Sequence, residues 1–212
     1  MNRFSVRLLA GAALAGFGVL AQAADIELPE PEKSGGMPLM EALQLRQSTR
    51  AYSAEPLSEQ LLSNLLWAAD GVSRPDGKRT APSAMNQQTI DLYVLLAGGT
   101  YRYDAARNRL IEVTDGDLRS KAVMQDFAQK APLVLVYVTD TTKRQGEQGL
   151  FYGAVDCGFI GQNVYLFCAA NRLGTVFLGS VNVKAMETAL KLPENHKVIF
   201  AQAVGHPAEE QQ

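Results

Sequence analysis

The sequence predicts an α+β domain in which a mixed β-sheet is flanked by helices. Residues 132–138 form an unbroken apolar run, which is typical of a strand covered on both faces. Residues 90–97 have the β-branched and apolar content of a second strand. Two further strand-like segments, residues 100–104 and 109–113, are joined by four residues that indicate a hairpin. Residues 150–171 are apolar nearly all round, as expected of a long helix buried on all sides.

Two helices are predicted before the first of these strands. Residues 37–47 are expected to form a short helix that directs Met40 and Leu43 toward the core. Ser58 is the expected N-cap of a stronger helix, whose apolar positions recur at helical spacing as far as Ala69. A polar loop, residues 71–81, follows this helix.

Three more elements complete the predicted domain. Residues 118–130 predict a modest helix, residues 175–180 an extended segment, and residues 197–204 the last strand. The long helix at residues 150–171 has two open interpretations. It is either the central helix of a monomeric core or a helix that another backbone approaches closely, along a strip of small residues. The strip consists of Gly153, Ala154, Gly158 and Gly161.

Length and composition agree with one globular domain. The chain has 212 residues, 47% of them hydrophobic, and a formal net charge of −2. This balance gives no basic excess for binding nucleic acid and no acidic run typical of a disordered tail. We expect a single domain over residues 37–212, preceded by an extended, mobile lead-in at residues 25–36. No metal site is predicted, because His196 and His206 have no partner at ligand spacing.

Residues 1–24 have the features of a secretory signal peptide. Two arginines precede the apolar run at residues 8–20, and small residues follow it. The run of about thirteen residues is shorter than the roughly 20 that span a bilayer, although a retained membrane anchor is the alternative. We expect Sec-type export, cleavage after Ala23 or Ala24, and a periplasmic mature protein that is not membrane-bound. The leader shows neither a twin-arginine nor a lipoprotein signal.

The two cysteines are predicted to be reduced and buried, or at most to pair between molecules. Cys157 and Cys168 lie eleven positions apart in one predicted helix. At 1.5 Å per residue their backbones would be about 16 Å apart. A disulfide requires less than about 7 Å.

The stretch from Arg46 to Arg50 has the chemistry of a phosphate site. Its two arginines present planar forks of donors that grip phosphate in bidentate fashion. Ser48 between them adds a hydrogen bond without bulk. The alternative is a helix end with solvated charges.

A second stretch, residues 81–87, is a turn of small and polar residues. Pro82, Ser83, Ala84 and Asn86 would let backbone amides approach a planar ligand, although this is also ordinary turn chemistry. A phosphate with an aromatic ring attached would suit both stretches.

Taken together, these stretches resemble the nitroreductase-like flavoprotein family, whose members hold FMN non-covalently between two subunits. The resemblance covers residues 38–207. Residues 65–71 and 101–104 look more like the subgroup that contains peptide azoline dehydrogenases. The matching residues are Arg46, Ser48, Arg50 and Tyr52, then Pro82, Ser83, Asn86 and Gln87, and later Asp156, Gly158, Gln162, Asn163, Leu173 and Gly174.

The resemblance implies a nitroreductase-like fold with a mainly antiparallel sheet, a homodimer that uses the long helix, and an FMN site built from both chains. Many relatives also have a basic pair after the last strand. Here residues 208–212 include two glutamates, which would oppose phosphate. The implied cofactor-binding residues are Arg46, Gln47, Ser48, Arg50, Pro82, Ser83, Ala84, Asn86, Leu178 and Gly179.

The resemblance therefore implies an FMN-dependent oxidoreductase. It would pass hydride or electrons from a reductant to a small oxidised acceptor, nitroaromatic or quinone-like. No catalytic side chain is assigned. Two alternatives stay open: a non-catalytic periplasmic module that binds flavin or another planar ligand, and a structural dimer without a ligand. Export favours the first alternative, because NAD(P)H is a cytoplasmic reductant.

Overall fold

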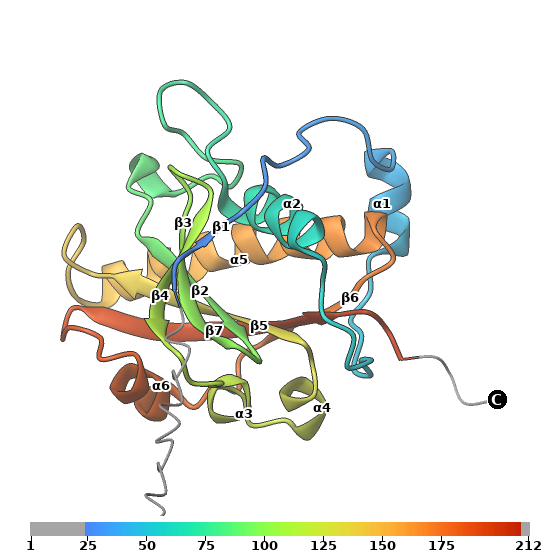
Figure 1. Cartoon of the computed structure of the whole chain (residues 1–212). Helices are drawn as coiled ribbons and strands as arrows, with labels where there is room; N and C mark the ends of the chain where they lie inside the picture. Colours follow the sequence, from blue (N-terminus) through green and yellow to red (C-terminus); the bar gives the residue numbers. More distant parts are fainter. Residues whose placement is uncertain (1–23, 209–212) are drawn as a thin grey trace, which may run out of the picture.

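The computed structural model describes residues 24–208, which fold around one seven-stranded sheet (Figure 1). The predicted signal peptide therefore lies outside the described residues, apart from Ala24. The strand order is β1-β4-β3-β2-β5-β7-β6. The strands are β1 (Ile26–Glu27), β2 (Ile90–Leu96), β3 (Gly99–Asp104), β4 (Arg109–Thr114), β5 (Leu133–Asp140), β6 (Gly174–Leu178) and β7 (His196–Gly205).

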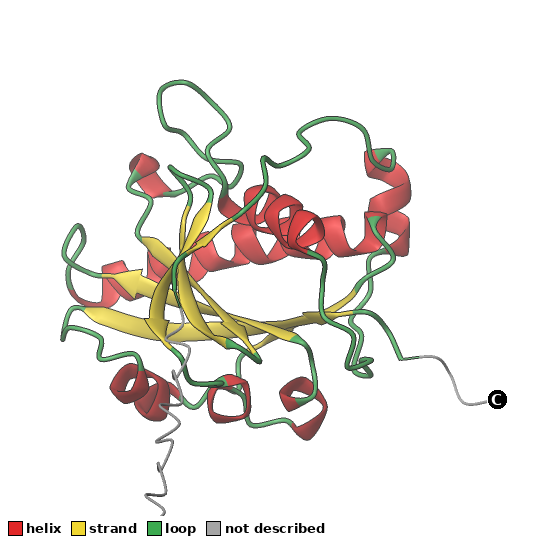
Figure 2. Cartoon of the chain, viewed as in Figure 1, coloured by secondary structure: helices red, strands yellow, loops and turns green. Residues whose placement is uncertain are grey.

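Helices cover both faces of this sheet (Figure 2). Two of them, α2 (Glu59–Asp70) and α5 (Gly146–Ala170), lie on one face, and α1 (Leu39–Leu45) packs against α5. Three shorter helices cover the other face. They are α3 (Arg119–Ala122), α4 (Asp126–Gln129) and α6 (Val183–Ala189). The predicted α+β class with flanking helices is confirmed.

The sheet is antiparallel at every described pairing, so the predicted mixture of directions was wrong. The reason is the position of β7. The crossover through α5 makes β5 and β6 run in the same direction, which would give a parallel pair if they were neighbours. Instead β7 lies between them and is antiparallel to both.

Strand β5 is buried on both faces, as its unbroken apolar sequence predicted. Leu133, Leu135 and Tyr137 join the core under α2 and α5, whereas Val134 and Val136 join the core under the three short helices. Alternation along one strand thus supplies both cores.

Two helix predictions need correction. The single helix predicted at residues 118–130 is divided into α3 and α4, because Val123 is extended and forms a bridge with Val181. In α1 the buried residue is Ala42, whereas Met40 and Leu43, expected in the core, are 75% and 43% exposed. Helix α6 was not predicted.

Part of the segment at residues 25–36, predicted as a mobile lead-in, is bonded to the domain. Ile26 and Glu27 pair with β4, and the Asp25 carboxylate accepts the backbone N–H of Glu112 at 2.9 Å. The carbonyl of Pro29 accepts a hydrogen bond from the Ser63 hydroxyl of α2. The sequence did not indicate these contacts.

Helix α5 packs closely on the sheet through glycines. A Cβ added at Gly161 would lie 2.6 Å from the Phe177 ring of β6, and one at Gly153 would lie 2.5 Å from the Thr139 hydroxyl of β5. Beside this contact, Gln202 of β7 accepts the Tyr137 hydroxyl at 2.6 Å and donates to the carbonyl of Gly161 at 3.3 Å. The buried amide is thus satisfied by the helix and the sheet together.

We therefore expect Gly161→Ala to lower the free energy of unfolding by about 1–3 kcal/mol, because overpacking exceeds the gain in helix propensity. Chemical denaturation measures this change. Gly98→Ala is the control, since nothing lies within 4 Å of the added Cβ there. Equal stability of the two variants would contradict the close contact of α5 with the sheet.

Candidate functional site

The Arg46–Arg50 stretch follows α1 and lies against the beginning of β6. The backbone N–H of Thr49 donates to the carbonyl of Thr175 at 2.9 Å, and the Thr49 side chain fills the space beside Gly174. Ser48 is placed by α5, because its hydroxyl shares a hydrogen bond of 2.9 Å with the Tyr165 hydroxyl.

Tyr165 connects three elements of this region. Its hydroxyl also accepts the backbone N–H of Phe177 at 2.9 Å, and the Arg46 guanidinium lies 5.2 Å from the centre of its ring. Tyr165 therefore positions both Arg46 and Ser48. Sequence reasoning missed it, because one aromatic residue in an apolar helix is more often core filler.

Arg46 and Arg50 have no carboxylate partner within the described residues 24–208. Neither takes part in any of the salt bridges found among residues 24–208. Arg46 is half-buried and Arg50 is exposed. Two cations four positions apart, with a hydroxyl between them, suit an anion with several acceptor oxygens.

The second stretch forms a tight turn at residues 83–87, and Ala84–Asn86 is a single turn of 3-10 helix. Asp156 of α5 holds this turn, because its carboxylate accepts the backbone N–H of Ala84 at 3.2 Å. Ser83 is used inside the turn, since its hydroxyl accepts the N–H of Gln88 at 3.0 Å. Asn86 adopts a left-handed conformation, with φ of 54°, that asparagine tolerates.

The two stretches are not brought together within one chain. One is attached to α5 at Tyr165 and the other at Asp156, nine positions away. That separation is a rise of about 13 Å along a helix. The predicted phosphate and ring contacts thus lie at different places on the same helix.

The remaining predicted residues differ in their access to a ligand. Leu178 is 5% exposed, with its side chain in the core beneath α6, so that only its backbone could reach a ligand. Gly179 is exposed, with open space where a Cβ would be. Gln47 is exposed and lines a cavity of about 250 Å3 beside Tyr165 and Arg172.

A protein-family model described as the nitroreductase family matches residues 43–206. This chain belongs to the nitroreductase family. A relative from Methanocaldococcus jannaschii, whose provisional name is nitroreductase, is 32% identical over 80% of this chain and 91% of that protein. The NADPH-flavin oxidoreductase of Vibrio harveyi is 31% identical over 46% of this chain and 47% of that protein.

A solved structure agrees with the fold of this nitroreductase-family chain. A crystal structure from Ralstonia eutropha JMP134, also with a provisional nitroreductase name, has a TM-score of 0.84 and 40% identity. The match covers 89% of this chain and 91% of the Ralstonia eutropha chain. The predicted family and fold are confirmed. The narrower resemblance to peptide azoline dehydrogenases stays a prediction.

Two other chemical features bear on the site. Among residues 24–208 no three His, Cys, Asp or Glu side chains cluster as a metal would require, and no helix there is long and apolar enough to cross a membrane.

Cys157 and Cys168 are buried and unpaired, and burial raises the pKa of both thiols. The expected burial of both thiols is confirmed, and they are not bonded to each other.

A buried ion pair that the sequence did not reveal lies near the turn at residues 83–87. Arg79, from the loop before the turn, bonds the carboxylate of Asp70 at the end of α2. Burial raises the pKa of Asp70 to about 7, opposed by the charge and hydrogen bond of Arg79 and assisted by the charges of Asp156 and Asp91. Burial also raises the pKa of Asp156.

The raised pKa of Asp70 predicts a pH dependence of stability. The folded state retains the Asp70 proton up to about pH 7, whereas the unfolded state loses it near pH 4, its ordinary range. Between these values the folded state binds more protons, so its stability falls as pH rises. A difference of about three units between the folded and unfolded pKa of Asp70 corresponds to a loss on the order of 4 kcal/mol in the free energy of unfolding. This loss is complete above pH 7.

Unfolding of the wild-type chain and of Asp70→Asn should therefore be compared from pH 4 to pH 8. We expect the stability of wild type relative to Asp70→Asn to decline across this window and then level off. The stability of wild type relative to Asp115→Asn, a substitution at an exposed position, should show no such decline. A relative stability that rises with pH would mean that the attraction of Arg79 outweighs burial.

Proposed function

We propose that this nitroreductase-family chain is an FMN-dependent oxidoreductase that passes electrons from a reductant to a small oxidised acceptor, nitroaromatic or quinone-like. The observation that supports this most strongly is Arg46 beside the hydrogen-bonded Ser48 and Tyr165, with Arg50 four positions on; neither arginine forms a salt bridge among residues 24–208. Membership of the family supports a flavin-dependent oxidoreductase in general. So does the Vibrio harveyi relative, which is named an NADPH-flavin oxidoreductase.

The residues present fit the phosphate end of FMN. A phosphate monoester carries up to two negative charges and several acceptor oxygens, which Arg46, Arg50 and the Ser48 hydroxyl can satisfy. Cations without protein partners keep their donors available for such a group. The backbone of the Pro82–Asn86 turn and of Gly179 would approach the ring and the ribityl chain without bulky side chains.

Bound FMN would supply the redox chemistry, as hydride or single-electron transfer. The chain contributes position and electric field. If Arg46 or Arg50 instead stood near the pyrimidine edge, it would stabilise the negative charge that reduced flavin acquires. Asp156 keeps the turn in place by accepting the Ala84 N–H, and Tyr165 keeps Ser48 and Arg46 in place.

A homodimer would complete the site. Helix α5 was predicted to be buried on all sides, but several large apolar side chains of α1 and α5 are exposed in the single chain. A second copy would cover them, as an apolar exposed patch suggests, and would bring its own turn toward Arg46. The exposed residues are Leu39, Met40, Leu43 and Leu45 of α1, and Leu150, Phe151, Tyr152, Val155 and Phe159 of α5.

We further propose that the protein works in the periplasm after removal of its leader. The support is the order of charged, apolar and small residues in residues 1–24. Periplasmic location would require an electron donor other than cytoplasmic NAD(P)H.

One alternative is a protein that binds the ligand without catalysing a reaction. The glutamates at residues 209–210, where relatives have a basic pair, favour a flavin- or planar-ligand-binding module. Repeated reduction and reoxidation of bound flavin by small molecules would exclude this alternative. Flavin that stays oxidised with every donor would support it.

FMN binding tests the proposal through Arg46. We expect FMN to raise the thermal midpoint of the wild-type chain, as a ligand of the native state does. Arg46→Ala should weaken binding by about 10- to 100-fold, because it removes charge-assisted hydrogen bonds worth roughly 1.5–3 kcal/mol. Fluorescence titration of FMN gives both dissociation constants.

Lys184→Ala is the matched control, since Lys184 is an exposed cation on α6, across the sheet from α5. It should leave FMN affinity unchanged. Equal affinity of Arg46→Ala and wild type would instead favour a structural dimer whose arginines are merely solvated.

The proposed dimer predicts that a charge on the exposed face of α5 separates the subunits. Phe159 is 43% exposed, and Phe159→Asp should give a monomer in analytical ultracentrifugation that no longer retains FMN. Val183→Asp on α6, at a residue 40% exposed on the opposite side of the sheet, should remain dimeric. A monomeric wild type that binds FMN tightly would refute the shared site.

A further inference from the structure

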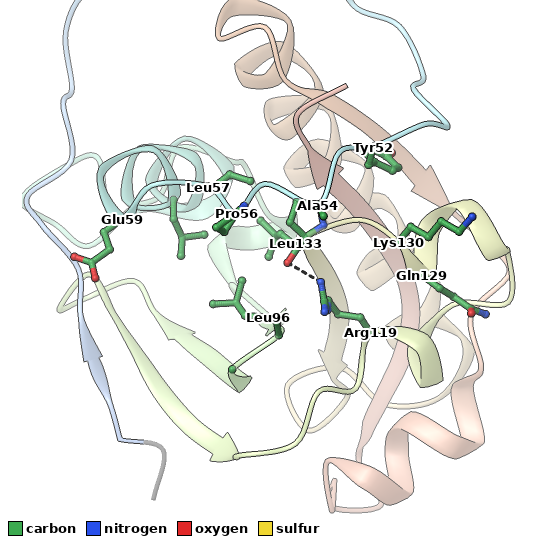
Figure 3. Close-up of a pocket in the computed structure, with 14 residues that line it drawn as sticks. Tyr52, Ala54, Pro56, Leu57, Glu59, Leu96, Arg119, Gln129, Lys130 and Leu133 are labelled. Carbon is green, nitrogen blue, oxygen red and sulfur yellow. Dashed lines mark hydrogen bonds between the residues drawn. The ribbon is translucent and has the colours of Figure 1, made fainter. Parts of the chain in front are cut away.

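A cavity of about 680 Å3 lies at the end of the sheet, away from the predicted cofactor residues (Figure 3). It is bounded by the loop before α2, the turn between β2 and β3, the start of β5, and helices α3 and α4. Cavities of 300–1,000 Å3 are typical of sites for small molecules. Its volume suits a ligand of that class.

The wall of this cavity is mainly apolar and is held in place. Leu57, Leu96 and Leu133 form its centre in Figure 3. The Tyr52 hydroxyl donates to the carbonyl of Thr49 at 2.6 Å, which fixes the aromatic ring at one side. A wall that is ordered before binding lowers the entropic cost of taking up a ligand.

Arg119 is also fixed, and its charge is neutralised. Its guanidinium pairs with the Asp117 carboxylate at 2.7 and 2.9 Å and donates to the carbonyls of Ala131 and Pro132 at 2.9 and 3.2 Å. One N–H remains for another acceptor. Arg119 therefore serves mainly as a rigid wall.

Lys130 supplies the charge that is still available. It makes no salt bridge among residues 24–208 and lies at the rim beside Gln129, with its ammonium group free to meet an anion. Glu59 lies at the opposite side of the cavity (Figure 3). This placement orients a ligand with its negative group toward Lys130 and its uncharged end toward Glu59.

The cavity is separate from the proposed flavin site and from the proposed dimer face. Its lining includes none of the ten predicted cofactor-binding residues and no residue of α1 or α5.

We propose that this cavity binds an apolar small molecule with one carboxylate, which pairs with Lys130 while the apolar body lies along Leu57, Leu96 and Leu133. The proposal does not depend on the flavin chemistry. It adds a second ligand site to the molecule, at the opposite side of the Tyr52 segment from α5.

The test compares two probes that differ in charge, 4-phenylbutanoate and 4-phenylbutan-1-ol, by chemical-shift titration of the ¹⁵N-labelled protein. We expect both to shift amides that line the cavity, and the carboxylate to bind about three- to tenfold more tightly. Lys130→Ala should abolish that difference, and Lys121→Ala, on the exposed surface of α3, should retain it.

Two blocking variants locate the binding. Ala54→Trp and Ala97→Trp place an indole in the cavity from exposed loop positions, and each should weaken both probes at least tenfold while the thermal midpoint stays unchanged. Saturating FMN should leave probe binding unaltered. Displacement by FMN, shifts confined to α1 and α5, or binding that survives both tryptophans would overturn the proposal.

Discussion

The close contact of α5 with the sheet is the constraint on which the rest of the molecule depends. Gly153 and Gly161 let the helix axis approach β5, β6 and β7, and no larger residue fits at either place. The buried amide of Gln202 is satisfied only while Gly161 and Tyr137 stay in position. Because α5 is fixed in this way, groups along its length can serve as anchors for loops.

Both candidate binding stretches use α5 as such an anchor. Tyr165 holds the Ser48 segment, and Asp156 holds the turn at Ala84. Asn163, between them, donates to the carbonyl of Ala69 near the end of α2. Asp156, Asn163 and Tyr165 of this mainly apolar helix thus each bond a group on another segment. Loops that are hydrogen-bonded to such a helix are ordered before a ligand binds, although they contain no long hydrophobic segments of their own.

The sequence was sufficient for the elements with strong periodicity or unbroken apolar runs. Strand β5 and helix α2 followed their patterns, and Ser58 caps α2 through the N–H of Leu61 as expected. The errors came where tertiary contacts outweighed local pattern. Val123 is extended because it pairs with Val181, and Met40 is exposed because α1 packs on α5 through another face.

The candidate site was predictable in composition but not in geometry. Arg46, Ser48 and the Pro82–Asn86 turn could be identified as residue types suited to phosphate and a planar ring. On α5, Asp156 was identified only as a match to the family pattern, without its contact to the turn. Tyr165 was not identified, since one tyrosine in an apolar helix carries no periodic signal. The Asp70–Arg79 pair was also invisible, because its meaning depends on burial at the end of α2 rather than on spacing.

The separation of the two stretches on α5 agrees with the symmetry of the proposed dimer. In a two-fold interface, a residue that meets a second residue of the partner is matched by the reverse contact. If α5 crosses the α5 of a second copy in opposite direction, the region of Asp156 in one chain lies near the region of Tyr165 in the other. A distance of about 13 Å along the helix, which keeps the two stretches of one chain apart, then becomes the spacing that generates two equivalent sites. The exposed apolar residues of α5 lie on the same helix and would be buried by the same association. The proposal thus explains with one contact both the incomplete site and the uncovered surface.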